Sequence, residues 1–142
     1  MMNIKEYAKN KLLLDGYTCV IYDGENEILS RERGVSFLLG LYNDSVNLKS
    51  HFAADKVVGK GAALLYVLLG VDEIYAHIIS SSALDVLCKY GIKCTYNTLV
   101  PHIINRAGDG ICPIESATMD IDDPDDAPNV ITTTLEKLKN AK

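Results

Sequence analysis

The chain has 142 residues, of which 48% are hydrophobic and 23% charged, and these values predict a single domain over residues 1–142 with one hydrophobic core. A formal net charge of -5 argues against general nucleic-acid binding, which depends on a basic surface. No apolar run reaches the roughly 18 residues that a membrane span needs, and the N-terminal residues lack the apolar segment of a signal peptide. We therefore expect a cytoplasmic protein with no membrane partner.

The first third of the chain predicts a helix, a hairpin and a second helix. Apolar side chains at near-helical spacing indicate a helix over Ile4–Leu14. Two β-rich segments, Tyr17–Tyr22 and Glu27–Ser30, flank the turn-forming residues 23–26 and indicate an antiparallel hairpin. Apolar residues at helical spacing over Gly34–Tyr42 then predict the second helix.

The segment Ala54–Leu69 predicts one central helix around which the domain is organised. From Ala62 onward it carries no charge on any face, which is typical of a helix that is buried on nearly all sides. Its start carries Asp55, Lys56 and Lys60, and a helix N-terminus offers unpaired N–H groups and the positive end of a dipole. The sequence therefore predicts a site for an anionic ligand at this helix start.

The next segments alternate between strand and helix. Glu73–Ile79 and Lys93–Val100 are β-rich, and between them Ala83–Tyr90 has the pattern of a helix that the hydroxyls of residues 80–82 can cap. Such alternation predicts parallel strands with helices packed on the faces of the sheet.

The C-terminal third predicts two further helices. Pro113 and Glu115 stand at the first and third positions of a helix start that Cys112 precedes. After an acidic turn at Asp122–Asp126, the segment Asn129–Lys139 has one apolar face and ends in lysines, which favours an amphipathic C-terminal helix.

The predicted order of elements resembles the cytidine deaminase fold, a three-layer αβα sandwich around a mixed sheet that begins with a hairpin. Zinc-dependent deaminases carry His or Cys ligands at two helix starts. Here those positions are occupied by Asp55–Lys60 and Ser80–Leu84, which contain neither His nor Cys. The resemblance therefore implies a deaminase-like α/β domain without a bound metal or cofactor.

The chain is also similar, over most of its length, to a small bacterial and archaeal family of unknown function that has this deaminase-like fold without the zinc motif. The segments that carry the similarity are Asp55–Ala63, Gly110–Glu115 and Ile121–Pro124. The resemblance implies the fold and a pocket between two helix starts, and the family has no established activity. Because deaminase-like domains often self-associate, it also implies a homo-oligomer.

The predicted ligand site consists of polar and glycine residues at the two helix starts. These residues are Asp55, Lys56, Gly59, Lys60, Ser80, Ser81 and Ser82. Asp55 could instead be a plain N-cap, the lysines a solvated face and the serines only caps. Gly59 and Gly61 would each cost about 1 kcal/mol inside a helix, which indicates the close approach of a neighbouring element or a ligand.

Three side chains are candidates for catalysis, namely Asp55, Cys112 and Glu115. Cys112 precedes a helix start, where the dipole lowers the pKa of a thiol, and His102 is the candidate base near it in the sequence. The competing interpretation is structural, with Cys112 packed in the interior and Glu115 capping its own helix. The cysteines of the chain lack a CxxC spacing and are predicted to be reduced thiols.

These residues leave three functions open. The first is a binding domain for a small anionic or nucleotide-like ligand. The second is a zinc-independent enzyme that acts on a nucleoside or nucleotide derivative, with Asp55 as acid, base or nucleophile and Cys112 or Glu115 assisting. The third is a structural subunit whose pocket is vestigial.

Overall fold

The structure is a computed structural model that describes residues 3–141, which form an α/β domain. Its elements in chain order are α1 (Ile4–Asp15), β1 (Cys19–Tyr22), β2 (Glu27–Ser30), α2 (Ser36–Asn43), β3 (Phe52–Val58), α3 (Lys60–Leu69), β4 (Glu73–Ser80), α4 (Ser81–Lys89), β5 (Lys93–Val100), α5 (Pro113–Thr118), the short 3-10 helix η1 (Pro124–Asp126) and α6 (Ala127–Asn140). Within these residues, no helix is long and apolar enough to cross a membrane.

The five strands form one mixed sheet in the order β2-β1-β3-β4-β5. β1 and β2 form the predicted hairpin, in which Cys19 pairs with Ser30. β1 also pairs antiparallel with β3, whereas β3, β4 and β5 run parallel to one another. The mixed sheet that begins with a hairpin is therefore confirmed.

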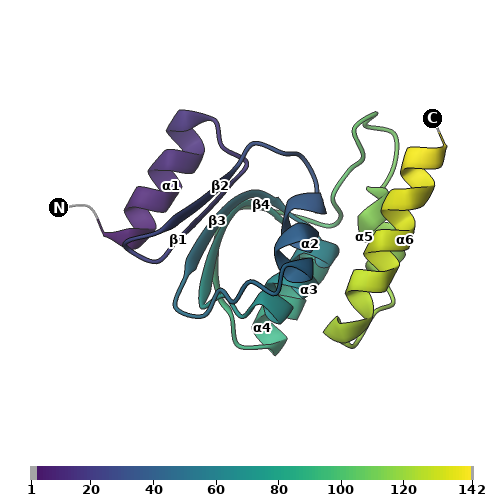
Figure 1. Cartoon of the computed structure of the whole chain (residues 1–142). Helices are drawn as coiled ribbons and strands as arrows, with labels where there is room; N and C mark the ends of the chain where they lie inside the picture. The colour runs from purple at the N-terminus through teal and green to yellow at the C-terminus, as the bar shows by residue number, and fades with distance from the viewer. Residues whose placement is uncertain (1–2, 142) are drawn as a thin grey trace.

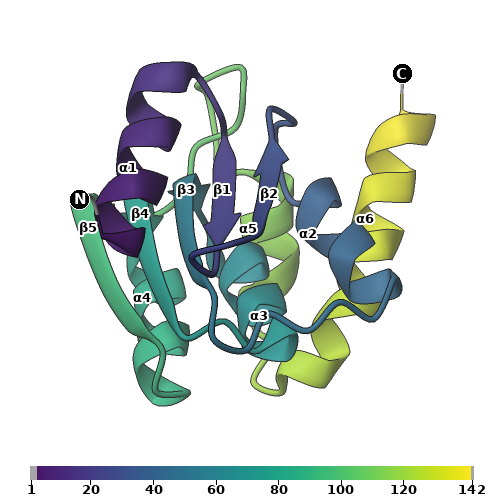
Figure 2. The same cartoon turned by 60° about the vertical axis from the view of Figure 1, so that its left-hand side comes forward.

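The helices cover the two faces of the sheet unequally (Figure 1). α1 packs on β1 and β3, where its fully buried Ala8 and Leu12 join a small cluster with Ala54. α2, α3 and α4 cover the opposite face, and α5 and α6 pack on the outer side of α3 (Figures 1 and 2). This arrangement is consistent with a three-layer sandwich, to which α5 and α6 add helices beyond α3.

α3 is buried on nearly all sides, as its apolar sequence predicts. Ala63, Leu65 and Tyr66 have no exposed surface, because the helix lies between the sheet on one side and α5 and α6 on the other. A Cβ atom on Gly61 would lie 2.6 Å from Cγ2 of Ile114 in α5, which is closer than real Cβ atoms approach. Gly61 therefore allows α5 to pack against the first turn of α3, which explains the glycine inside a helix.

The prediction of one continuous helix over Ala54–Leu69 is wrong in its first part. Residues Phe52–Val58 form the central strand β3, and α3 begins only at Lys60. Asp55 is consequently a strand residue that pairs with Cys19 and Ala76 rather than a helix N-cap. Pairing on both sides of β3 outweighs the weak β-propensity of its alanine and charged residues.

Candidate functional site

The starts of α3 and α4 lie side by side at the C-terminal ends of the parallel strands β3 and β4. The two helices follow β3 and β4 directly, and these strands are parallel neighbours in which Val58 pairs with Ile79. Gly59 is the N-cap of α3 and contributes no side-chain hydrogen bond. Ser80 is the N-cap of α4, where its Oγ accepts a hydrogen bond from the amide of Ala83 at 3.3 Å. The start of α3 therefore needs an acceptor from elsewhere in the chain.

Glu115 of α5 supplies that acceptor. Its side chain is only 1% exposed, and Oε1 accepts hydrogen bonds from Lys60 N at 2.8 Å, Ser80 Oγ at 2.8 Å and Ser82 Oγ at 3.3 Å. Oε2 accepts a further bond from the amide of Ile103 in the loop after β5. One carboxylate thus joins the starts of α3 and α4 to this loop, and the prediction that Glu115 caps its own helix is wrong.

The glycine at the start of α3 makes room for this carboxylate. A Cβ atom on Gly59 would lie 3.3 Å from Oε1 of Glu115 and 3.2 Å from Cγ1 of Ile103. Both distances are tighter than ordinary van der Waals contacts, so that a larger residue would push Glu115 or the loop away. The predicted close approach at Gly59 is therefore made by Glu115 and Ile103.

The two lysines of the predicted site lie in different elements. Lys56 is a half-buried residue of β3, whereas Lys60 opens α3 and is only 9% exposed. The ammonium of Lys60 donates a 2.6 Å hydrogen bond to the carbonyl of Met119, at the end of α5. The prediction that both lysines lie at the start of one helix is wrong for Lys56, which precedes α3.

The remaining predicted ligand residue on α4 is Ser81. It is exposed, and its Oγ donates a 3.3 Å hydrogen bond to the carbonyl of Val100 at the end of β5. Ser80 and Ser82 therefore face Glu115, while Ser81 faces the neighbouring strand.

Asp55 lies in a separate buried cluster between the sheet and α3. Its Oδ2 accepts a 2.7 Å hydrogen bond from the hydroxyl of Tyr66, and Oδ1 accepts one from the amide of Val57 at 3.3 Å. The Tyr66 oxygen also lies 3.3 Å from Sγ of Cys19. Because the Tyr66 proton points to Asp55, the thiol of Cys19 is the donor in this contact.

Burial controls the protonation of this cluster. It raises the pKa of Asp55 to about 6, against a lowering effect of the hydrogen bonds from Tyr66 and the backbone. Burial also raises the pKa of Tyr66 and that of Cys19 well above their ordinary values. Tyr66 and Cys19 are thus neutral at pH 7, and Asp55 is the group that titrates near neutrality.

The three candidate catalytic side chains are not brought together. Among the described residues, no hydrogen bond joins Asp55 to Cys112 or Glu115. Cys112 is the N-cap of α5, as predicted, and its amide donates to the carbonyl of Ile103 at 2.8 Å. His102, the expected base for Cys112, has a buried Nδ1 for which residues 3–141 supply no hydrogen-bond partner.

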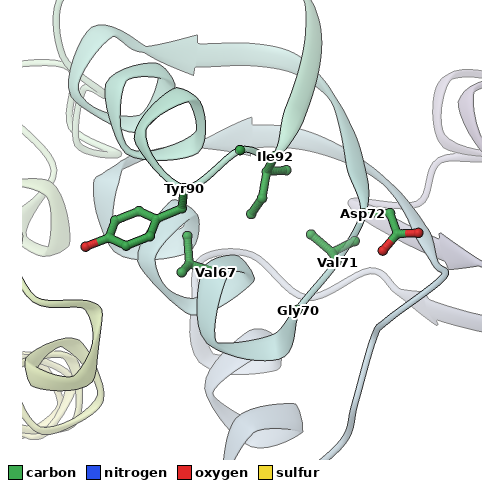
Figure 3. A pocket seen from close by; sticks show the side chains of 7 residues that line it. Val67, Gly70, Val71, Asp72, Tyr90 and Ile92 are labelled. Carbon is green, nitrogen blue, oxygen red and sulfur yellow. The ribbon is translucent and has the colours of Figure 1, made fainter.

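Two cavities lie at the other end of α3, away from the predicted site. One, of about 340 Å³, is formed where α3 and α4 end (Figure 3). It is lined by Val67, Gly70, Val71, Asp72, Tyr90, Gly91 and Ile92. The other, of about 570 Å³, lies where α2 and α3 end and includes Tyr42 and Leu68. Neither cavity contains a residue of the predicted ligand site.

The predicted site does not include Tyr66, Cys19 or Ile103. Tyr66 carried a usable signal, because a hydroxyl within an otherwise apolar helix needs a buried hydrogen-bond partner. Nothing in the sequence indicates that the backbone N–H of Ile103 donates to Glu115. No cluster of three or more His, Cys, Asp or Glu side chains that could hold a metal ion occurs in the described part of the chain.

These features define an α/β domain with a mixed five-stranded sheet, in which two helix starts meet at a buried carboxylate. Residues 7–135 match the family described as a domain of unknown function, DUF1893, and the chain belongs to this family. The fold is similar to the crystal structure of a DUF1893 family protein, TM1506, from Thermotoga maritima, with a TM-score of 0.86 and 26% sequence identity over 94% of this chain and 90% of that chain. No curated protein matches the sequence.

Proposed function

We propose that this DUF1893 domain is a zinc-independent, deaminase-like binding domain for a small anionic or nucleotide-like ligand, which binds at the starts of α3 and α4. The strand order and the two helices that follow β3 and β4 on the same face support the deaminase-like assignment, because the resemblance places a ligand between two such helix starts. Lys56, Gly59 and Ser81 belong to the proposed site, with Lys56 and Ser81 offering a cation and a hydroxyl that reach the surface, whereas Asp55 lies in the separate cluster with Tyr66.

One observation carries the proposal, namely that the helix starts already bind an anionic group. A single oxygen of Glu115 accepts hydrogen bonds from Lys60, Ser80 and Ser82, which are three residues of the predicted ligand site. The positive ends of two helix dipoles and these donors suit a carboxylate or phosphate oxygen. A ligand binds there by exchange with Glu115, and the loop that carries Ile103 moves with it.

Two other functions have an observation in their favour. A structural subunit with a vestigial pocket is favoured by the burial of Glu115 and its four hydrogen bonds, which would make it a permanent occupant. A zinc-independent enzyme acting on a nucleoside or nucleotide derivative is favoured by Asp55, because a pKa of about 6 suits a general acid or base near neutrality. In that enzyme Cys112 or Glu115 would assist.

Thermal unfolding of the wild-type chain and of Glu115→Ala, with acetate, phosphate or adenosine monophosphate added, tests the binding proposal. Glu115→Ala opens the anion site, so we expect added anions to raise its melting temperature. If the proposal is correct, phosphate or the nucleotide also raises the melting temperature of the wild type. The free energy of unfolding then increases by about 2.7 kcal/mol when the ligand concentration is a hundred times its Kd. Glu136→Ala, which removes an exposed carboxylate from α6, is the control.

The outcomes separate the three functions. A response of Glu115→Ala without a response of the wild type means a permanently occupied pocket. No response of either chain refutes an anion site at the helix starts. Conversion of a nucleoside or nucleotide by the wild type, detected by mass spectrometry and lost in Asp55→Asn, would instead establish the enzyme.

A further inference from the structure

β5 forms a long edge of the sheet that is open on one side. It is paired with β4 over its whole length, from Lys93 opposite Glu73 to Val100 opposite Ser80. Its other side has no paired strand among residues 3–141, and Figure 2 shows β5 at the margin of the molecule. Every second residue of such an edge directs its N–H and C=O groups outward, where another strand can bind them.

This edge lacks the features that usually prevent pairing between chains. Proteins protect sheet edges with short strands, charged residues, proline or bulges. β5 has eight residues in unbroken register with β4, and Lys93, at its first position, is its one charged residue. Its exposed side chains include Tyr96, which is 42% exposed, and Leu99, which is 44% exposed.

The opposite edge of the sheet, β2, is protected in the usual way. It has only four residues, and Glu27 at its start forms an ion pair with Lys11 of α1. The two edges of one sheet thus differ in length, since β2 has four residues and β5 has eight, and in that the single charged residue of β2 is held in an ion pair with α1. This difference indicates that β5 is covered in the functional assembly.

We propose that β5 pairs with β5 of a second copy of this chain, antiparallel and around a two-fold axis at Tyr96, so that the two sheets become continuous. The axis brings the two Tyr96 side chains together as a cross-strand aromatic pair. The register also places Lys93 opposite Leu99, Cys94 opposite Thr98, and Thr95 opposite Asn97.

A second copy fits this edge because the strand is complementary to itself. No like charges face each other in the proposed register, since Lys93 meets the apolar Leu99. A copy of β5 also has the same length, so that seven of its eight residues, 93–99, can pair around an axis at Tyr96. A partner of another kind would have no acidic or basic pattern on β5 to recognise, because the strand is neutral beyond Lys93.

A stable dimer needs contact surface from α4 as well as from β5. A standard interface buries about 800 Å² on each partner, close to a tenth of the 7837 Å² accessible surface of this chain. α4 packs on β5, and a two-fold axis brings both copies of α4 to the same side of the joined sheet. The exposed charged residues of α4 are one acid and one base, Asp85 and Lys89. Contact between the two antiparallel copies of α4 therefore does not bring only like charges together.

Sedimentation velocity of the wild-type chain over a range of micromolar concentrations, beside Tyr96→Lys and Leu99→Lys, tests this proposal. We expect the wild type to dimerise reversibly. Tyr96→Lys brings two ammonium groups together at the axis, and Leu99→Lys faces Lys93 of the second copy, so that each should raise the dimer Kd about tenfold or more. Leu13→Lys is the matched control because Leu13 is 45% exposed and belongs to α1, which packs on β1 and β3.

Circular dichroism and thermal unfolding show whether each variant folds, and two variants are used so that one folding failure leaves the test intact. A wild type that stays monomeric at all concentrations overturns the proposal. So does a dimer whose Kd is unchanged in both Tyr96→Lys and Leu99→Lys, because the interface would then lie elsewhere.

Discussion

Replacing Asp55 by Asn removes a carboxyl group whose pKa burial raises from 3.8 to about 6. The substitution preserves the shape of the side chain. Asn can still accept the hydrogen bond from Val57, and its amide can donate to the Tyr66 oxygen. The variant therefore imitates the protonated form of Asp55 at every pH.

The folded chain binds the proton of the Asp55 carboxyl more tightly than the unfolded chain does. This difference sets the direction in which the free energy of unfolding changes with pH. Asp55 contributes most to the free energy of unfolding below the unfolded pKa of 3.8, and this contribution is lost as the pH rises through about 6. The rise in pKa corresponds to about 3 kcal/mol, because each tenfold change in proton affinity is worth about 1.4 kcal/mol. Between about pH 4 and pH 7, the wild type should lose roughly this much stability relative to Asp55→Asn.

Urea unfolding of both chains at several pH values measures this difference. Other titrating groups, such as the exposed carboxylates, act equally on both chains and cancel in the comparison. Asp120→Asn, at an exposed position, is the control and should remain within about 0.5 kcal/mol of the wild type at each pH. A difference between Asp55→Asn and the wild type that stays constant across this range would refute the assignment of Asp55 as the titrating buried group.

Three further substitutions test the packing of the buried groups by urea unfolding. Tyr66→Phe removes the hydroxyl that donates to Asp55 and should cost about 1–3 kcal/mol at pH 7, and the loss should shrink in acid, where Asp55 is protonated. Gly61→Ala should cost about 1–3 kcal/mol through its clash with Ile114, and Ile114→Ala should relieve part of that cost in the double variant. Glu115→Gln should cost about 1–3 kcal/mol, because its amide group would face one of the backbone donors; equal stability to the wild type would contradict the geometry at Glu115.

Local patterns were sufficient for the elements with regular periodicity. The hairpin of β1 and β2 and the buried helix α3 were predicted because turn residues and unbroken apolar runs are local signals. β3 was not, since its charged residues Asp55 and Lys56 interrupt the apolar pattern of a buried strand. Its conformation depends on pairing with β1 and β4, whose positions in space a local pattern does not contain.

The sequence predicted two neighbouring helix starts but not the group that lies between them. Two helix starts that lie side by side bring two positive dipole ends together, and this arrangement requires a negative group between them. The sequence showed the helix starts and led to an external anion. The structure places Glu115 there, 55 residues after Lys60 in the chain, with Gly59 leaving the space that its carboxylate fills. The same electrostatic requirement therefore accounts for both the internal carboxylate and the proposed ligand. Anion binding by Glu115→Ala tests the requirement itself, because this variant keeps the helix dipoles, and anion binding by the wild type tests whether a ligand displaces Glu115.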